Sequence, residues 1–263
     1  MISRRQIVLG APLLGAWCAP ASAQVRDIND AINKAGRQRM LSQRMAKAYL
    51  ALGQGVRREQ AERVLADSMS LFDRQLVELR AYAPRQDIRQ VYERLESTWG
   101  GYKTALVGAL PTKPGSETVL ALSGQVLAQA NQGTQLLEAA SGRPVGKLVN
   151  VAGRQRMLSQ RMAAMYLAAS WGVQPEPSSK AMNAAREEFG QAQEVLRAAP
   201  EATPAILEAL GLADQQFGFF VALLGGLKPG QANARAQADA FTTSERILQM
   251  LDEVTALFAR GAG

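Results

Sequence analysis

The apolar residues of the chain recur at spacings of three and four, which is the period of amphipathic helices. Val64, Met69, Phe72, Leu76 and Leu79 form one such stripe, and segments rich in β-branched residues are scarce. Glycine and proline separate the stripes at intervals typical of helical hairpins. The pattern predicts an all-α protein with eight helices, at residues 26–54, 57–82, 86–109, 116–140, 145–172, 178–198, 204–224 and 231–259.

Two of these helices have recognisable capping residues at their starts. Thr203 precedes Pro204, which places a side-chain acceptor before a proline at the first helical position. Ser116 follows Gly115 and can cap the fourth helix in the same way. We therefore expect these two helices to begin at Pro204 and near Ser116.

The predicted helices fall into two sets of four, because the chain repeats itself. The stretch AGRQRMLSQRMA occupies residues 35–46 and again, unchanged, residues 152–163, an offset of 117 residues that also maps Tyr49 onto Tyr166. A repeat of this length indicates a tandem duplication, and short links between neighbouring helices favour an up-down four-helix bundle for each copy. We predict two tandem bundles related by a pseudo-twofold axis, at residues 24–142 and 143–263.

Residues 1–23 resemble a secretory signal peptide that is removed from the mature protein. Arg4 and Arg5 give a basic start, an apolar run follows from Ile7 to Trp17, and small residues lead to Ala23. The arginine pair fits a twin-arginine signal as well as an ordinary one, so both export routes are kept as alternatives. The apolar run is too short for a membrane span, and we expect no later stretch to approach the necessary length of about 20 apolar residues. These features predict a periplasmic protein without a transmembrane segment in the mature chain.

The mature chain would contain neither histidine nor cysteine, because Cys18 lies in the signal peptide. This composition excludes disulfides, zinc sites built on Cys or His, thiol nucleophiles and histidine acid–base pairs. Glu187-Glu188 and Asp252-Glu253 are helical neighbours whose side chains point in different directions, so they make poor acid–base pairs. We expect no enzymatic activity, no metal site and no cofactor.

The net charge is mildly basic. The formal charge of +7 becomes +5 when Arg4 and Arg5 are removed with the signal peptide. A protein with this charge can attract small anions, but it lacks the basic runs of a nucleic-acid-binding tail. Its few aromatic residues are not interleaved with basic clusters, so we expect no nucleic-acid partner.

The repeated stretch gives its helix two faces to bury. One face steps by four and three residues, the spacing of a helix–helix seam, through Ala35, Arg39, Ser42, Ala46, Tyr49 and Gly53. The other lies about a third of a turn away and consists of Leu41, Met45, Ala48 and Leu52. The Leu and Met seam is suited to the core of its own bundle, whereas the small residues of the first seam allow another helix to approach closely.

Arg39 is the anomaly on the small-residue seam. An unpaired buried charge costs several kcal/mol, and no acidic residue lies within one helical turn of Arg39. Gly36 is a second anomaly, because glycine in a helix interior costs about 1 kcal/mol relative to alanine. It leaves room beside the guanidinium for something small. Arg156 and Gly153 repeat this arrangement in the second copy.

Pairing of the two repeated helices about a pseudo-twofold axis would bring Arg39 and Arg156 together. Two guanidinium groups repel each other unless an anion lies between them, and their planar forks are suited to nitrate, nitrite or a carboxylate. The candidate anion-binding residues are Arg39, Arg156, Gly36, Gly153, Ala35, Ala152, Ser42, Ser159, Gln43 and Gln160.

Other features of the repeat have simpler interpretations. Arginines on helices are usually solvated or paired with a carboxylate of another helix, and we interpret Arg37, Arg44, Arg154 and Arg161 in this way. The paired methionines at positions 40, 45, 157 and 162 are interpreted as core residues. A recent duplication could also explain the identity of the copies, but it would not confine that identity to residues 35–46 and 152–163. The confinement favours a functional role for the stretch.

The segment Asn33-Lys34-Ala35-Gly36-Arg37-Gln38-Arg39-Met40 resembles the signature of the PilJ-type sensor domain of type IV pilus chemotaxis transducers. It is also similar to the P-box of nitrate/nitrite sensor histidine kinases, which share an Asn-x-Ala-Gly-x-x-Arg-Met core, and Asn150–Met157 match this core again. The resemblance implies a four-helix sensor domain that dimerises through its first helix and binds nitrate or a similar anion at that interface. The binding arginine would be Arg39 in the first repeat and Arg156 in the second.

The chain also departs from this resemblance. Sensors of the family are usually anchored by transmembrane helices, continue into a signalling domain and carry one unit per chain. Here we expect neither transmembrane helices nor a signalling domain. The chain carries two units, so the homodimer of the family would have become an internal pseudo-dimer. One hypothesis is a soluble periplasmic protein that binds nitrate or nitrite for sensing or uptake, with a membrane sensor or transporter as partner. The alternative is a ligand-free interaction module that docks on a chemotaxis transducer, a pilus or a transport component.

Overall fold

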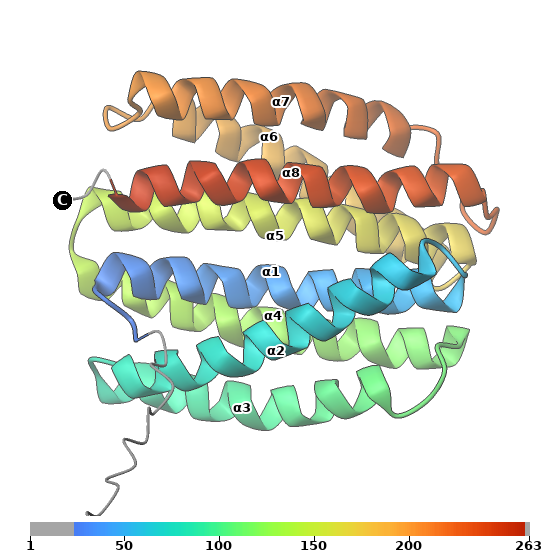
Figure 1. Cartoon of the computed structure of the whole chain (residues 1–263), viewed down its shortest axis with the longest axis horizontal. Coiled ribbons are helices and arrows are strands. Elements are labelled where there is room, and N and C mark those ends of the chain that lie inside the picture. The colour runs from blue at the N-terminus through green and yellow to red at the C-terminus, as the bar shows by residue number, and fades with distance from the viewer. Residues whose placement is uncertain (1–23, 261–263) are drawn as a thin grey trace, which may run out of the picture.

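The computed structural model describes residues 24–260, and the predicted signal peptide with Cys18 lies outside this part of the chain. The described residues form eight helices and no strands, as the hydrophobic pattern predicts (Figure 1). The helices are α1 (Ile28–Gly53), α2 (Arg58–Tyr82), α3 (Gln86–Val107), α4 (Lys113–Ser141), α5 (Pro144–Trp171), α6 (Pro175–Arg197), α7 (Pro204–Leu224) and α8 (Ala234–Arg260).

Capping residues explain where two of these helices begin. The Thr203 hydroxyl accepts a hydrogen bond from the Ile206 amide at 3.4 Å, which confirms the predicted start of α7. The predicted start of α4 at Ser116 was wrong. Thr112 caps this helix by accepting from the Gly115 amide at 3.1 Å, so α4 begins three residues earlier, at Lys113. Pro114 permits this start because the first turn of a helix needs no amide hydrogen from it.

The eight helices form two four-helix bundles, α1–α4 and α5–α8. Figure 1 shows α1 and α5 side by side in the middle of the molecule, with the rest of each bundle on opposite sides of this pair. The contact between α1 and α5 is the most extensive between any two helices of the described chain, which confirms the predicted pairing of the repeated helices. Helices α4 and α8 flank this pair, α4 packing on α1 and α8 on α5.

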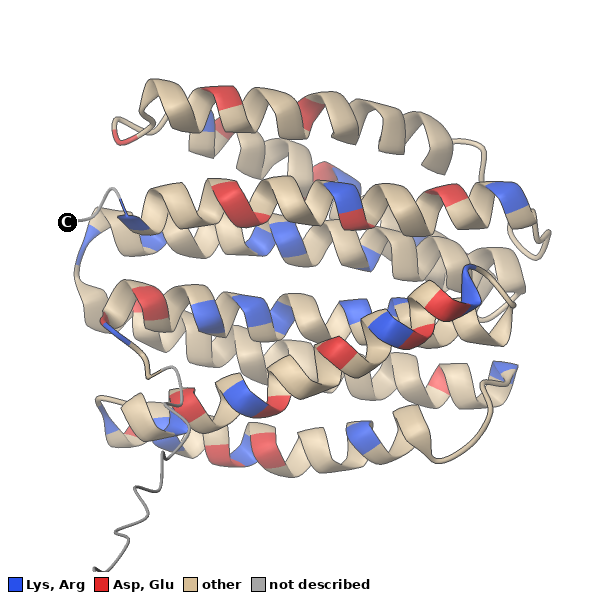
Figure 2. Ribbon diagram, in the orientation of Figure 1, with Lys and Arg blue, Asp and Glu red and all other residues tan. Residues whose placement is uncertain are grey.

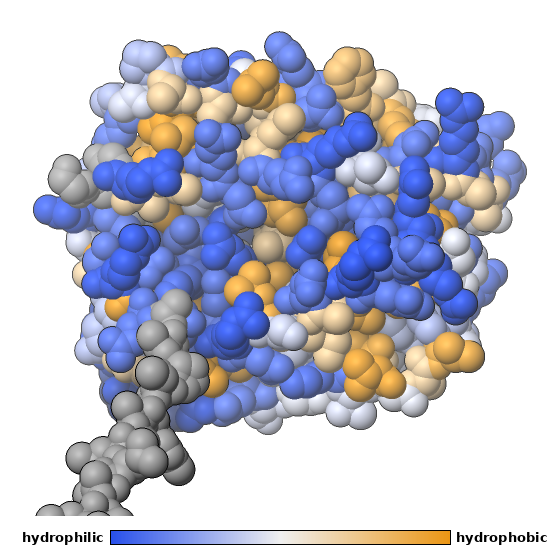
Figure 3. Space-filling view, viewed as in Figure 1, coloured by the Kyte–Doolittle hydropathy of each residue, from blue (hydrophilic) through white to orange (hydrophobic). Residues whose placement is uncertain are grey.

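Burial along α1 and α5 follows from this central position. Each helix is covered by its own bundle on one side and by the other bundle on the opposite side. The four methionines of the identical stretches are buried, as predicted, at Met40, Met45, Met157 and Met162. The two helices are also strongly basic: α5 carries no acidic residue and α1 carries only Asp30 (Figure 2). The centre of the molecule therefore buries positive charge, whereas the face seen in Figure 3 is mainly hydrophilic with scattered apolar residues.

Helix α7 is more apolar than we expected of any stretch after the signal peptide. Within residues 24–260 it is the one helix whose length and composition would permit it to cross a membrane. Ile206, Leu210 and Phe220 of this helix are buried, whereas Leu212 and Phe219 are exposed. A single helix of this kind is weak evidence for a membrane span, because core helices and signal sequences have the same length and composition.

Candidate functional site

The guanidinium groups of Arg39 and Arg156 meet where α1 crosses α5. Both side chains are 0 % exposed. A Cβ atom built on Gly36 would lie 3.3 Å from Nη2 of Arg39 and 3.5 Å from Nη2 of Arg156, and a Cβ atom on Gly153 would lie at the same two distances from Arg156 and Arg39. The same Cβ atom on Gly36 would be 3.6 Å from the Cα atom of Gly153, so the glycines also allow close backbone approach. The predicted convergence of the two arginines beside the two glycines is present in the structure.

Each arginine reaches across to the other repeat. Nη2 of Arg39 donates to the carbonyl oxygen of Asn150 at 3.1 Å. Nη2 of Arg156 donates to the carbonyl oxygen of Asn33 at 3.2 Å and to its side-chain oxygen at 2.8 Å. Asn33 and Asn150 are related by the same offset of 117 residues, so these contacts follow the pseudo-twofold axis.

The second contact of each guanidinium is made within its own repeat, and here the two sides differ. Nη1 of Arg156 donates to Oδ1 of Asp252 in α8 at 2.7 Å, which forms an ion pair. Nη1 of Arg39 donates to Oδ1 of Asn131 in α4 at 2.9 Å, which is neutral. The hydrogen bonds and ion pairs of the described chain therefore give Arg156 a carboxylate partner and Arg39 only neutral ones.

The electrostatics of the pair reflect burial and crowding. Burial lowers the pKa of Arg39 to about 9, and the nearby charges of Arg154 and Arg156 act in the same direction. Burial likewise lowers the pKa of Arg156 to about 10, although Asp252 acts in the opposite direction. Both groups are still charged at pH 7. The Nε atoms of both arginines are buried and have no hydrogen-bond partner among residues 24–260, so each guanidinium keeps an unused donor.

The remaining candidate residues lie around this pair with their polar groups already engaged. Ala35 and Ala152 are buried in the α1–α5 contact. The hydroxyls of Ser42 and Ser159 donate to the carbonyl oxygens of Arg39 and Arg156, each at 2.8 Å. Gln43 donates to the carbonyl oxygen of Ser123 and accepts from Arg161, and Gln160 donates to the carbonyl oxygen of Ser244 and accepts from Lys47. These residues support the helices that carry the arginines, and none of these hydrogen bonds involves a guanidinium of the pair.

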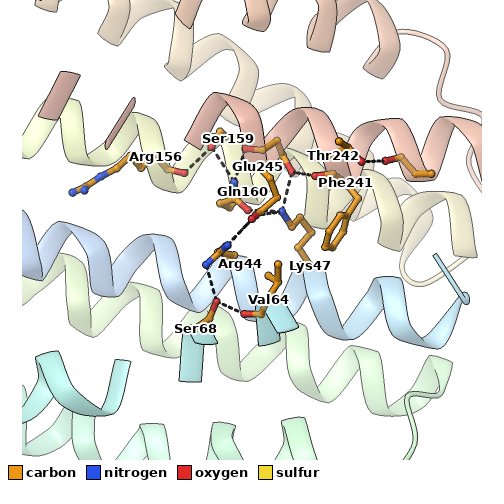
Figure 4. A network of polar contacts seen from close by, with 12 residues as sticks. Arg44, Lys47, Val64, Ser68, Arg156, Ser159, Gln160, Phe241, Thr242 and Glu245 are labelled. Carbon is orange, nitrogen blue, oxygen red and sulfur yellow. Dashed lines mark hydrogen bonds and ion pairs between the residues drawn. The ribbon is translucent and has the colours of Figure 1, made fainter. Parts of the chain in front are cut away.

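A second buried polar network lies farther along the same helix contact (Figure 4). Nζ of Lys47 donates to Gln160 at 2.7 Å, to Ser244 at 2.9 Å and to Glu245 at 2.6 Å, and Arg44 also pairs with Glu245. Burial lowers the pKa of Lys47 to about 8 although Glu245 opposes this shift. Burial raises the pKa of Glu245, but the charges of Lys47 and Arg44 outweigh this effect and lower it to about 2. Arg44 also donates to the hydroxyl of Ser68 in α2 at 3.3 Å, so the network joins α1, α2, α5 and α8.

The arginines interpreted as ordinary have partners on other helices. Arg37 pairs with Asp252, Arg44 with Glu245 and Arg154 with Glu188. Arg161 donates to Gln43 at 3.2 Å. Within the described residues, no group of three or more His, Cys, Asp and Glu side chains is placed to hold a metal ion.

Four residues at the site were not among the sequence candidates. Asn33 and Asn150 could have been found, because they begin the repeated motif and are related by its offset. Asn131 and Asp252 carry no comparable signal, since they lie on α4 and α8 at a different offset and their neighbourhoods in the sequence differ. Only the packed structure brings them to the arginines.

Comparisons with known proteins agree with this architecture. The family described as "Type IV pili methyl-accepting chemotaxis transducer N-term" matches the chain twice, at residues 21–141 and 139–257. Neither a comparison with curated proteins nor one with solved structures gave a match. No catalytic family was found, and the matched sensor domains are non-catalytic.

Proposed function

Since the chain belongs to the PilJ family of type IV pilus chemotaxis transducer N-terminal domains, we propose that it is an exported sensory protein that binds one small oxyanion between α1 and α5. Nitrate and nitrite are the favoured ligands. The protein would act in the periplasm and would serve sensing or uptake through a membrane sensor or transporter. The family itself supports an extracytoplasmic sensory module and leaves the ligand unspecified.

The observation that carries this proposal is the convergence of two fully buried guanidinium groups, which among residues 24–260 have a single carboxylate in contact. Removing one charge from water without compensation costs several kcal/mol, and a second like charge nearby increases this cost. A small anion next to the pair would offset both costs. The unused Nε donors favour a planar oxyanion, because arginine presents its hydrogens in a plane that matches carboxylate-like geometry.

Burial also weighs against the alternative of a ligand-free docking module. That hypothesis requires Arg39 and Arg156 to meet carboxylates of a partner protein. Both side chains are 0 % exposed and lie between the two bundles, where another protein cannot reach them. A small anion needs a much smaller opening between the bundles than another protein does.

Isothermal titration calorimetry on the full mature chain tests the proposal, with nitrate, nitrite, sulfate and chloride as titrants. We expect nitrate or nitrite to bind at one per chain and to raise the melting temperature. An anion at about 100 times its Kd would add about 2.7 kcal/mol to the free energy of unfolding. Arg39→Ala should abolish binding, whereas Arg94→Ala, an exposed arginine on α3, should bind as the wild type does. Neither heat nor a rise in melting temperature with any of the anions would contradict the proposal.

A further inference from the structure

The pseudo-twofold axis relates two sides of the arginine pair that are chemically different. On the second-repeat side, Oδ1 of Asp252 lies 2.7 Å from Arg156 and 3.6 Å from Arg37. On the first-repeat side, Oδ1 of Asn131 takes the same place, at 2.9 Å from Arg39 and 3.3 Å from Arg154. Arg37 and Arg154 are themselves related by the repeat offset. A carboxylate on one side is thus replaced by an amide of nearly the same shape on the other.

A buried tyrosine adds to the difference. Tyr92 of α3 is 0 % exposed, and its hydroxyl has no hydrogen-bond partner among the described residues. A Cβ atom built on Gly133, two residues from Asn131 on α4, would lie 3.0 Å from the Tyr92 hydroxyl, which places this hydroxyl against α4. Burial raises the pKa of Tyr92, while the charge of Arg39 acts in the opposite direction. The matching position on α7 is Leu210, because α3 and α7 begin at Gln86 and Pro204. The first-repeat side therefore holds a spare buried hydroxyl where the second-repeat side has only apolar carbon.

The other acids near Arg39 do not contact it. Glu138 accepts a hydrogen bond from the Asn150 side chain, and Glu188 is paired with Arg154. Glu138 raises the pKa of Arg39 through its charge, but less than burial and the other arginines lower it. An anion approaching Arg39 would therefore displace or join neutral oxygens. An anion approaching Arg156 would meet the Asp252 carboxylate.

A surface pocket borders each side of the arginine pair. An open pocket of about 490 Å³ is lined by Glu138, Arg143, Lys147 and Asn150, among others. Asn150 lines this pocket, and its carbonyl oxygen accepts from Arg39. On the other side, Asn33 accepts from Arg156 and lines a pocket of about 420 Å³ whose lining includes the acids Asp27 and Asp30. In the pocket at Asn150, the bases Arg143 and Lys147 outnumber the acid Glu138, so its charge favours an anion over a cation.

We propose that the oxyanion binds on the first-repeat side, against Arg39, with Asn131 and the Tyr92 hydroxyl as neutral partners. Asp252 closes the equivalent position beside Arg156 to anions, so the chain binds one oxyanion and not two. This inference rests on the proposed function and places the anion site on one side of the arginine pair. Asn131 is then the residue that keeps the first-repeat side open to an anion, because its replacement by a carboxylate would make both sides alike.

Exchange of the two residues tests this assignment. Nitrate would be titrated into the wild-type chain, Asn131→Asp, Asp252→Asn and the double exchange. An opposite charge within about 4–6 Å shifts a pKa by one to three units, which is tenfold to a thousandfold in an equilibrium constant, and a like charge acts in the other direction. We expect an effect in this range on nitrate binding. Asn131→Asp should therefore weaken nitrate binding at least tenfold. Asp252→Asn should bind nitrate at least as tightly as the wild type. Adding Asp252→Asn to Asn131→Asp should restore the binding of one nitrate per chain that Asn131→Asp alone loses.

Two further measurements keep the test decisive. Asn131→Asp should melt at or above the wild-type temperature without anion, because its carboxylate pairs with Arg39 and Arg154; a loss of binding in this chain cannot then come from unfolding. Tyr92→Phe leaves every charge in place and should weaken nitrate binding by two- to tenfold. If the wild type binds nitrate and Asn131→Asp binds equally well, the assignment to the first-repeat side is wrong while the proposed function stands. If all four chains fail to bind any oxyanion, the proposed function fails and this inference fails with it.

Discussion

Gly36 offers a way to separate anion binding from folding. Alanine in place of glycine inside a helix stabilises it by about 1 kcal/mol. At Gly36 the new methyl group would lie 3.3 Å from Nη2 of Arg39 and 3.5 Å from Nη2 of Arg156. The first distance is a few tenths of an ångström shorter than ordinary contact, and the atoms met are the ends of long, flexible side chains. We therefore expect Gly36→Ala to change the free energy of unfolding by no more than about 1 kcal/mol, or about 2–4 °C in melting temperature.

Anion affinity should respond much more strongly. The methyl group occupies the space beside both guanidinium groups and pushes them away from the glycines, so a bound nitrate loses contacts and alignment. We expect the affinity for nitrate to fall at least tenfold, as measured by calorimetry on the purified variant. Gly100→Ala is the matched control, because Gly100 lies inside α3 and a Cβ atom there has no neighbour within 4 Å. This control should gain helix stability and bind nitrate as the wild type does.

Two results would refute this reasoning. If Gly36→Ala binds nitrate with wild-type affinity while Gly100→Ala behaves as expected, the anion does not lie beside the glycines. If Gly36→Ala melts more than about 10 °C lower than the wild type, a loss of several kcal/mol, the arginines cannot move aside and the glycine is required for packing alone.

Three further predictions concern the buried charges and the core. Glu245→Gln should lower the free energy of unfolding by about 3 kcal/mol at pH 7, because the pKa of Glu245 is lowered from 4.5 to about 2 in the folded chain. Denaturant unfolding should show this difference from the wild type above pH 4.5, and the difference should disappear as the pH falls towards 2. The pKa of Lys47 is lowered from 10.5 to about 8, so the unfolded chain binds more protons between these values; the free energy of unfolding should rise with pH in this window, and Lys47→Met should lack that rise. Phe72→Ala should cost about 3–5 kcal/mol in urea unfolding, because the ring is 0 % exposed, whereas Val77→Ala on the exposed side of the same helix should stay within about 0.5 kcal/mol.

The helices could be predicted because their signal is local. The stripe through Phe72 and Leu76 repeats every turn, and both residues are buried in the structure. The start of α4 was missed because Thr112 and Ser116 both have hydroxyls that can cap a helix, and only the backbone shows which one accepts from an amide. In fact the Ser116 hydroxyl donates to the Thr112 carbonyl oxygen.

Only the part of the site that lies on the repeated helices α1 and α5 could be predicted from the sequence. Arg39 and Gly36 break the rules of the helix that carries them, so one repeat was enough to identify them. The contacts that distinguish the two sides come from α4 and α8, and Arg39 meets a residue 92 positions away. Glu245 lies 201 positions from its partner Arg44. Pairs at such separations leave no periodic trace in a single sequence, and packing alone brings them together.

The link between the two bundles has a consequence for how the protein behaves on dilution. Helix α4 ends at Ser141 and α5 begins at Pro144, so only Gly142 and Arg143 join the halves. Two subunits that meet as a dimer separate when their concentration falls below the dissociation constant. Here the second half remains within a few ångströms of the first at any concentration, and the entropy of bringing the halves together is lost once, when the chain is made. A receptor assembled in this way would respond to the amount of its ligand and not to the number of its own copies.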